Sequence, residues 1–498
     1  MPRWAGARSW IAGVPGTTLG IGTTAVLAVL GSRVTLALFV AGAAVLVALT
    51  ARASLKWPRP VLVGVTLSPI LDRYLAPGVL APEAEWLAHF LSEALLLVVG
   101  LTLVVQAARR GTLRSALSHP TLAFAAAFIG LAIASAVING VPGTQALAGI
   151  AFTLDAVALF FLARVVGFDS RHALGAIAAV AGLVLIAAVI VIAQALLTPH
   201  LLGLSALVGR FGEVYRLAAF FGDPNTAAAF LSAAIPFALF GATGLRTQRR
   251  RRIALAGGFL MALALWLSFS RGGWLGAVGG FSLAAVILDH RALRIGLLVM
   301  AAALVVALAM PRYLICDTCD DRPDLFGSTF GRFGTIGEGR DLRLLFIGNA
   351  LPIVADHPVL GVGPGRYGGA AADIFGTPIY VQYGTDSLFI DPSQRTVDDF
   401  WLHLVVESGV VGLLVYLAAV GAALRAVIHA ARTAALGRRV ALAGIAGAVA
   451  CLSINALTTM LLEANSAAFL FWFLLGIGSQ LTIQPGGDLT AQAAAAPA

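Results

Sequence analysis

Three side chains that can exchange protons stand one helical turn apart in the segment Val397-Asp-Asp-Phe-Trp-Leu-His-Leu-Val-Val-Glu407. On a helix, Asp399, His403 and Glu407 would form a single polar stripe because their spacing is four residues. Carboxylates and imidazoles can take a proton from a hydroxyl group, so Asp398, Asp399 and His403 are the catalytic candidates and Glu407 a supporting one. Two aspartates could instead only cap the start of a helix, where negative charge is favoured.

Two other motifs carry arginines that could bind an anion. In Arg216-Leu-Ala-Ala-Phe-Phe-Gly-Asp-Pro-Asn225, the proline interrupts a helix and frees backbone amides beside Arg216 and Asn225. In Leu267-Ser-Phe-Ser-Arg271, a tight turn between two apolar runs leaves Arg271 at the lip of the apolar region. Guanidinium groups bind phosphate oxygens bidentately, which favours a phosphate ligand. The alternative is a pair of interfacial arginines that only reach for water.

A fourth group lies between these motifs. The residues Arg340-Asp-Leu-Arg343 begin a predicted amphipathic helix of about fifteen residues. The strip Asp356-His-Pro-Val-Leu-Gly-Val-Gly-Pro-Gly365 follows, and its glycines would permit close approach to a ligand or to the membrane. We take Arg340 and Arg343 as further candidate cations and His357 as a supporting residue, with solvated loop charges as the alternative.

The elements that must position these groups are hydrophobic. Of the 498 residues, 59% are hydrophobic and 11% are charged, whereas a soluble domain has about 25% charged residues. Apolar runs long enough to cross a membrane recur along the chain. This pattern excludes a soluble enzyme, a disordered scaffold and a small disulfide-rich domain. It predicts an all-α polytopic membrane protein with about 12–14 transmembrane helices and one large extracytoplasmic loop region.

The predicted organisation has four parts. Residues 1–310 hold about eleven transmembrane helices, 311–400 form the extracytoplasmic loop region, 401–483 hold about three more helices, and 484–498 are a disordered cytoplasmic tail. The expected spans lie near 11–30, 34–50, 60–76, 87–106, 120–138, 146–167, 173–197, 217–244, 253–270, 272–288, 294–310, 401–428, 440–460 and 466–483.

The basic residues assign the sides of the membrane. The net charge is +9, and the arginines cluster in every second connection, as in Arg249 to Arg252. Because cytoplasmic loops carry the excess of basic residues, the large loop falls on the extracytoplasmic side. In this loop Cys316 and Cys319 could form a disulfide, stay free or bind a metal, whereas Cys451 is expected to pack inside a span.

Several arginines beside proton-accepting groups at the outer lip suit one kind of chemistry. A hydroxyl would attack a substrate whose leaving group is a lipid-anchored phosphate, and the arginines would absorb the developing negative charge. We therefore expect neither a metal nor a cofactor.

These motifs resemble the O-antigen ligase and polysaccharide-polymerase superfamily. The resemblance runs from roughly Arg210 to Leu417 and rests on RLAAFFGDPNTAAAFL, LSFSRGGWLG, DHPVLGVGPGRY and DDFWLHLVVESGVVGLL. It implies that Arg216 and Arg271 hold a lipid diphosphate, with Arg340 or Arg343 as a third cation. Asp398 stands where ligases of this superfamily carry a histidine. This departure argues against a lipid A-core ligase and leaves a polymerase, or a ligase with another acceptor, open.

The resemblance implies a membrane glycosyltransferase in the bacterial cytoplasmic membrane, with its active site on the extracytoplasmic side. Its donor would be an undecaprenyl-diphosphate-linked glycan and its acceptor a glycan, lipid or protein, within membrane lipids and without nucleic acid. The alternative is a polytopic transporter or flippase of a lipid-linked glycan or solute. The sequence leaves open the choice between ligase and polymerase, the sugar, the oligomeric state, and which of Asp398, Asp399 and His403 is the base.

Overall fold

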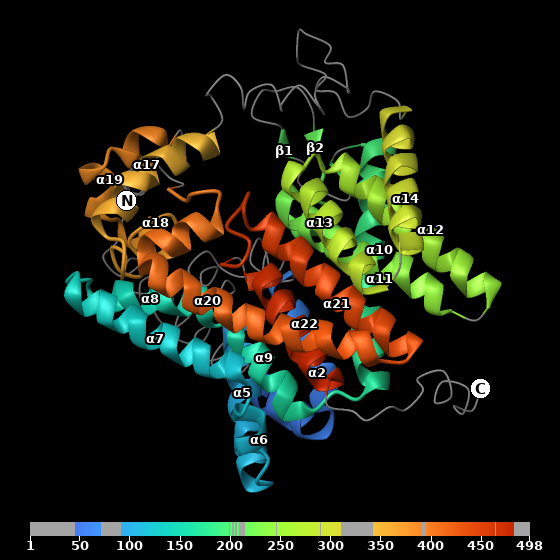
Figure 1. The fold of residues 1–498 in the computed structure, drawn as a ribbon, viewed down its shortest axis with the longest axis horizontal. Helices are drawn as coiled ribbons and strands as arrows, with labels where there is room; N and C mark the ends of the chain where they lie inside the picture. Colours follow the sequence, from blue (N-terminus) through green and yellow to red (C-terminus); the bar gives the residue numbers. More distant parts are fainter. Residues whose placement is uncertain are drawn as a thin grey trace, which may run out of the picture.

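The part of the chain that the structure describes folds almost entirely into α-helices (Figure 1). The computed structural model describes residues 45–70, 91–309 with gaps within 199–214 and at 246 and 289, 342–389, 395–463 and 465–482. In this part, the strands are the two-residue β1 (Leu207–Val208) and β2 (Tyr215–Arg216), which pair antiparallel. The all-α prediction is confirmed. Four predicted features lie outside the described residues, namely Arg340, the cysteines at 316 and 319, and the tail from 484 onward.

The helices fall into three consecutive groups along the chain. The first comprises α2 (Pro58–Leu67), α5 (Leu91–Arg109), α6 (Leu113–Leu117), α7 (Pro120–Ile138), α8 (Gly143–Leu154), α9 (Val157–Val166) and α10 (Ser170–Leu196). The second comprises η3 (Ala219–Phe221), α11 (Pro224–Gly244), α12 (Gln248–Leu267), α13 (Arg271–Leu288) and α14 (His290–Ala309). The third comprises α17 (Leu342–Asp356), α18 (Ala370–Phe375), α19 (Pro378–Gln382), η5 (Thr385–Leu388), α20 (Phe400–Thr433), α21 (Leu436–Asn455) and α22 (Asn465–Leu481).

Seven helices of the described part are long and apolar enough to cross a membrane, namely α5, α7, α10, α11, α13, α20 and α21. The pair α8 and α9 makes an eighth candidate if its two helices, bent by 52°, form one span. The protein is thus a polytopic membrane protein, as predicted. The total of about 12–14 spans stays a prediction, because the expected spans near 11–30 and 34–50 lie wholly or largely outside the described residues.

Three predicted spans differ from the observed helices, and one of them, near 401–428, is interrupted at Gly409. The span near 146–167 is broken after Leu154, where the Asp155 carboxylate accepts a hydrogen bond from the Ala156 N–H. The span near 217–244 becomes helical only at Pro224. Asp223 caps that helix by accepting from the Thr226 N–H at 2.7 Å, and proline suits a first helical position because it has no N–H to satisfy. The residues before it are free to form an irregular turn.

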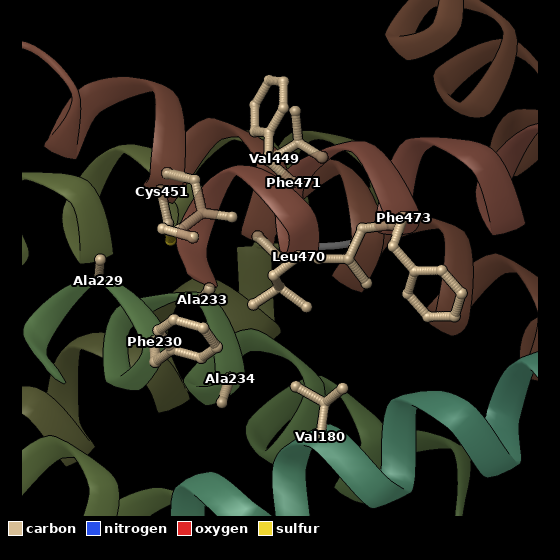
Figure 2. Packing of buried hydrophobic residues seen from close by; sticks show 14 of the residues in the cluster. Val180, Ala229, Phe230, Ala233, Ala234, Val449, Cys451, Leu470, Phe471 and Phe473 are labelled. Carbon is tan, nitrogen blue, oxygen red and sulfur yellow. The ribbon is translucent and has the colours of Figure 1, made fainter. Parts of the chain in front are cut away.

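Small residues let the central helices pack closely. Figure 2 shows side chains of α10, α11, α21 and α22 meeting in this core, among them Val180, Ala233 and Leu470. Helix α13 lies so close to α21 that a Cβ on Gly280 would overlap the Gly447 carbonyl oxygen. Glycines at such contacts are typical of helices that associate inside membranes. Cys451 is buried here with a free thiol, as the sequence predicts.

Helices α17, α18 and α19 lie together beside the start of α20, outside the membrane-spanning candidates (Figure 1). They enclose a small core of their own around Phe346, Tyr367 and Tyr380. A helix after Arg340 is confirmed as α17, which has fifteen residues and begins at Leu342. Its predicted amphipathic pattern is not confirmed, because Leu344 and Leu351 are exposed. These helices precede Asp398, which lies just before the start of α20 at one end of the helical bundle.

Candidate functional site

The two arginine motifs meet at one end of the bundle. The Arg216 guanidinium donates to the Asn225 side-chain oxygen at 2.7 Å and to the Ser268 carbonyl at 3.4 Å. The Ser270 hydroxyl donates to the same Asn225 oxygen at 3.0 Å. Arg271 follows directly as the first residue of α13. The structure therefore brings the predicted anion-binding residues Arg216, Asn225 and Arg271 into one neighbourhood.

Two strained residues flank these arginines. Ala219 and Phe269 have φ values of +48° and +50°, a left-handed conformation that is unfavourable for residues with a side chain. The Ala219 N–H is held by the side-chain oxygen of Gln194, which is fully buried in α10. Each such residue costs about 1–3 kcal/mol and persists only where its surroundings enforce it. The backbone beside both arginines is thus fixed by its surroundings.

The two adjacent aspartates have different surroundings. Asp399 caps α20: one carboxylate oxygen accepts from the Trp401 and Leu402 N–H groups, both at 3.0 Å. Burial raises the pKa of the Asp399 carboxyl to about 6, against the opposite effect of these N–H groups and of the nearby Arg343 guanidinium. Asp398 is exposed. The capping alternative thus applies to Asp399, whereas Asp398 lies at the surface of the protein.

The other two members of the predicted stripe are buried. His403 is 1% exposed and Glu407 is 4% exposed, and the His403 Nδ1 lies 3.8 Å from a Glu407 oxygen. The Glu407 carboxylate accepts hydrogen bonds from the Gly365 and Tyr367 N–H groups, each at 2.7 Å. His403 in turn donates from Nδ1 to the Tyr367 carbonyl. The spacing prediction is confirmed, but both side chains bind the glycine-rich strip and are closed to solvent.

A break in α20 completes this attachment. At Gly409 the helix is interrupted by a residue with φ of +67° and ψ of −179°. The break leaves the Val406 and Glu407 carbonyls to accept from the Val362 and Gly363 N–H groups, at 2.9 and 3.0 Å. A Cβ at Gly409 would overlap the Val359 carbonyl oxygen, so only glycine fits.

The glycine-rich strip therefore approaches protein backbone. On its other side, Gly365 touches α8, where a Cβ on Gly149 would overlap the Gly365 nitrogen. The Gln145 side chain of α8 also donates to the Gly365 carbonyl at 2.7 Å. The glycine-rich strip and the first part of α20, which are separate motifs in the sequence, thus bind each other through backbone and side-chain hydrogen bonds.

The loop between α21 and α22 joins the arginine and carboxylate sides of the site. Thr458 packs against Gly272, next to Arg271, so closely that a Cβ on Gly272 would overlap its hydroxyl. The Ala456 carbonyl accepts from the Phe400 N–H at 2.9 Å, beside Asp399. Residues 456–463 thus reach both sides, and they place Arg271 and Asp399 around the same end of the bundle.

Sequence reasoning missed Glu463, which ends this loop. Its carboxylate accepts from the Ala370 N–H at 3.0 Å. Burial raises the pKa of the Glu463 carboxyl, while the imidazole of His403 and that N–H act against the rise. A signal was present, because Glu463 is the sole charged residue between 440 and 483. An unexplained charge within an apolar region is a candidate functional residue.

The remaining candidates have more peripheral contacts. His357 begins the turn after α17, where its carbonyl accepts from the Gly361 N–H at 3.1 Å. Arg366, also missed, donates to the Gly140 carbonyl at 3.1 Å. Arg395 lies 3.7 Å from the Asp386 carboxylate. Within the described ranges, no three His, Cys, Asp or Glu side chains gather as ligands for a metal.

The site can be compared with known proteins. Residues 256–417 match the family model described as O-antigen ligase. The match includes Arg271, Arg343 and the segment from Asp398 to Glu407, whereas Arg216 and Asn225 precede it. Comparison with the curated proteins found no match. The motifs and the family model thus agree that residues 256–417 are similar to the O-antigen ligase family.

Proposed function

We propose that this protein transfers a glycan from an undecaprenyl-diphosphate carrier to a hydroxyl group of an acceptor, at the outer face of the cytoplasmic membrane. The family match supports a ligase or polymerase of the glycosyltransferase type. The carrier, the side of the membrane and the residue roles are our proposal. The observation that carries it is the placement of Arg216 and Arg271 at the same end of the bundle as the exposed carboxylate of Asp398.

In the proposed step, the acceptor oxygen forms a bond to the anomeric carbon of the donor sugar. The bond between that carbon and the diphosphate oxygen breaks, and the diphosphate leaves with the electron pair. The proton of the acceptor hydroxyl passes to the Asp398 carboxylate, which acts as the general base. Asp399 serves as the helix cap that fixes the position of its neighbour.

The leaving diphosphate gains negative charge as the bond breaks. Arg216 and Arg271 would bind its oxygens, with Arg343 as a further cation near Asp399. Positive groups fixed in advance stabilise such a transition state more than they stabilise the substrate. The Asn225 and Ser268 contacts of Arg216 support this role because they hold its guanidinium in one place.

The distribution of basic residues supports the outer location. Helix α11, one of the membrane-spanning candidates, begins beside the site at Pro224 and ends at Gly244, shortly before the exposed residues Arg249 to Arg252. Its 21 residues at about 1.5 Å each separate its ends by about 30 Å, the thickness of a hydrocarbon core. An arginine cluster of this kind is typical of the cytoplasmic side, which leaves the site on the other side.

The proposal is tested with the purified protein in nanodiscs. The donor is undecaprenyl diphosphate carrying a labelled oligosaccharide, and the acceptor is a second lipid-linked unit or a glycolipid. We expect Asp398→Asn to lower kcat by on the order of 100- to 1,000-fold, because the base is lost. Asp398→His should keep measurable activity, because an imidazole can accept the same proton.

Asp356→Asn is the matched control, since this carboxylate binds the exposed Tyr383 hydroxyl. It should leave the rate unchanged. A wild-type rate in Asp398→Asn would overturn the assignment of the base. Movement of the intact labelled lipid across the bilayer, without transfer of its glycan, would overturn the proposal in favour of a transporter.

A further inference from the structure

The buried imidazole of His403 lies near two buried carboxylates that come from different parts of the chain. A Glu407 oxygen is 3.8 Å from Nδ1. The two oxygens of Glu463 would lie 2.6 and 2.8 Å from a Cβ built on Gly369. The Cε1 atom of His403 would lie 2.7 Å from that same Cβ. The imidazole and the Glu463 carboxylate are therefore both packed against this glycine.

Hydrogen bonding determines one proton of the imidazole. The Tyr367 carbonyl can only accept, so Nδ1 of His403 must carry a hydrogen. The other ring nitrogen is buried and has no hydrogen-bond partner among the described residues. Two carboxylates this deeply buried would be costly without a compensating positive charge. An imidazolium at His403 would supply this charge.

The three groups hold one short segment from both ends. Glu407 accepts from the Gly365 and Tyr367 N–H groups, and Glu463 accepts from the Ala370 N–H. The segment 365–370 in turn holds the chain that leads into the site, because the Gly368 carbonyl accepts from the Val397 N–H at 2.9 Å. Asp398 is the next residue. A continuous series of contacts thus connects Glu463 to the exposed carboxylate.

We propose that Glu463 is a positioning residue, whose hydrogen bond to the Ala370 N–H and charge interaction with His403 fix the segment 365–370 and through it the place of Asp398. The kinetic part of this inference rests on the proposed function, whereas the pairing does not. Glu463 never meets the substrate: it is 9% exposed and bonded to backbone. It acts on the reaction through the geometry of the general base, where an error of about 1 Å can cost on the order of 100-fold in rate.

The test is a double-mutant cycle of Glu463→Gln, His403→Gln and the two together. Glutamine keeps an oxygen for the Ala370 N–H and removes only the charge. We expect Glu463→Gln to lower kcat about tenfold or more while KM changes little, because the donor site is intact. The Tm of this variant in detergent should fall by several degrees, since the buried imidazolium loses the negative charge of one neighbouring carboxylate.

The double variant should recover a part of the lost Tm, because neither charge is then left alone. Asp356→Asn again serves as the control and should match the wild type in both measurements. The inference is overturned if Glu463→Gln behaves like the wild type, or if the two single losses in Tm simply add, which would show that the residues do not interact.

The two proposals fail in different ways. If the wild type transfers no glycan, the proposed function is wrong, and the Tm cycle still decides whether Glu463 and His403 are coupled. If the wild type is active and the cycle shows no coupling, the positioning role is wrong and the proposed function stands.

Discussion

The two ends of helix α13 use arginine in opposite ways. At its first residue, Arg271 joins Arg216 in a neighbourhood held by Asn225 and by the strained turn at Phe269. At its last residues, Arg439 of α21 donates to the Ile287 carbonyl at 3.0 Å and to the Leu288 carbonyl at 3.4 Å. These carbonyls have no partner within the helix, so Arg439 completes the C-terminus of α13.

This difference shows that the number of arginines says little about function. The far end of the bundle holds the larger cluster, including the exposed Arg249 to Arg252 and Arg432. There the guanidinium groups face solvent or complete helix ends, which is what membrane topology requires. At the site end, Arg216 is held by the Asn225 side chain and the Ser268 carbonyl, and Arg343 lies near the carboxylate of Asp399. Surroundings, rather than charge, separate a binding residue from a topological one.

The largest expected effect is the loss of glycan transfer when an arginine is removed at the site end, compared with the removal of one at the far end. Arg216→Ala and Arg271→Ala should each lower kcat/KM for glycan transfer by about 100-fold or more, because the diphosphate loses a fixed cation. Lysine at either position should give an intermediate loss, since it keeps the charge without the bidentate geometry. Arg251→Ala at the far end should leave transfer unchanged. The measurement is initial rate against donor concentration in nanodiscs.

Equal losses in Arg251→Ala and Arg271→Ala would contradict the comparison. They would indicate that the total positive charge, and not its place, supports the activity. Expression and membrane insertion of each variant are checked by size-exclusion chromatography in detergent, so that a folding defect is not read as a loss of binding.

Helix α20 offers the next test, because it contains one glycine that the backbone requires, Gly409, and one that it does not, Gly421. Gly409→Ala should destabilise the protein by about 3 kcal/mol or more, since the backbone conformation excludes a side chain and the Val359 carbonyl blocks the Cβ. Gly421 is helical and a Cβ there would meet nothing within 4 Å. Gly421→Ala should therefore be neutral or stabilising by about 0.5–1 kcal/mol. Unfolding in detergent, followed by circular dichroism, measures both.

Glycan transfer adds a second measurement to this pair. Gly409→Ala should also reduce activity. The break at Gly409 frees the Val406 and Glu407 carbonyls that bind the glycine-rich strip, and this strip leads into the segment that the Glu407 carboxylate holds. If both alanine variants unfold like the wild type, the interlock between the glycine-rich strip and α20 is wrong.

Much of this architecture could be predicted from local sequence. The apolar runs predicted the helices, and the spacing of Asp399, His403 and Glu407 predicted their shared face. The turn before Arg271 was expected because the apolar runs almost touch. Each of these inferences depends on residues that are neighbours along the chain, where helical periodicity is a sufficient guide.

Long-range contacts were not accessible in the same way. The glycines before Tyr367 suggested a ligand, but their neighbour is the broken backbone of α20, which periodicity does not reveal. Glu463, in the loop after α21, and His403, in α20, are distant in sequence and come together only because both pack against Gly369. The start of α11 at Pro224 was missed for a different reason: hydropathy extends through the preceding residues, and the capping by Asp223 had to override it.

The smallest expected effect separates the two aspartates at the start of α20. Because burial raises the pKa of Asp399 to about 6, the folded protein holds this proton more tightly than the unfolded chain does. The resulting stabilisation is fully present below pH of about 4, where both states are protonated, and is lost as the pH rises through about 6. An asparagine side chain at this position would cap the helix without titrating. The difference in Tm between wild type and Asp399→Asn should therefore shift in favour of the variant between these pH values and stay constant above them.

A substitution without an ionisable group supplies the control for this pH scan. The same scan on Gly421→Ala should run parallel to the wild type in this range, since that substitution leaves every titrating side chain in place. A constant difference for Asp399→Asn across the whole range would mean that this carboxyl titrates alike in the folded and unfolded states. The inferred difference in surroundings between Asp399, the buried helix cap, and Asp398, the proposed base, would then be wrong.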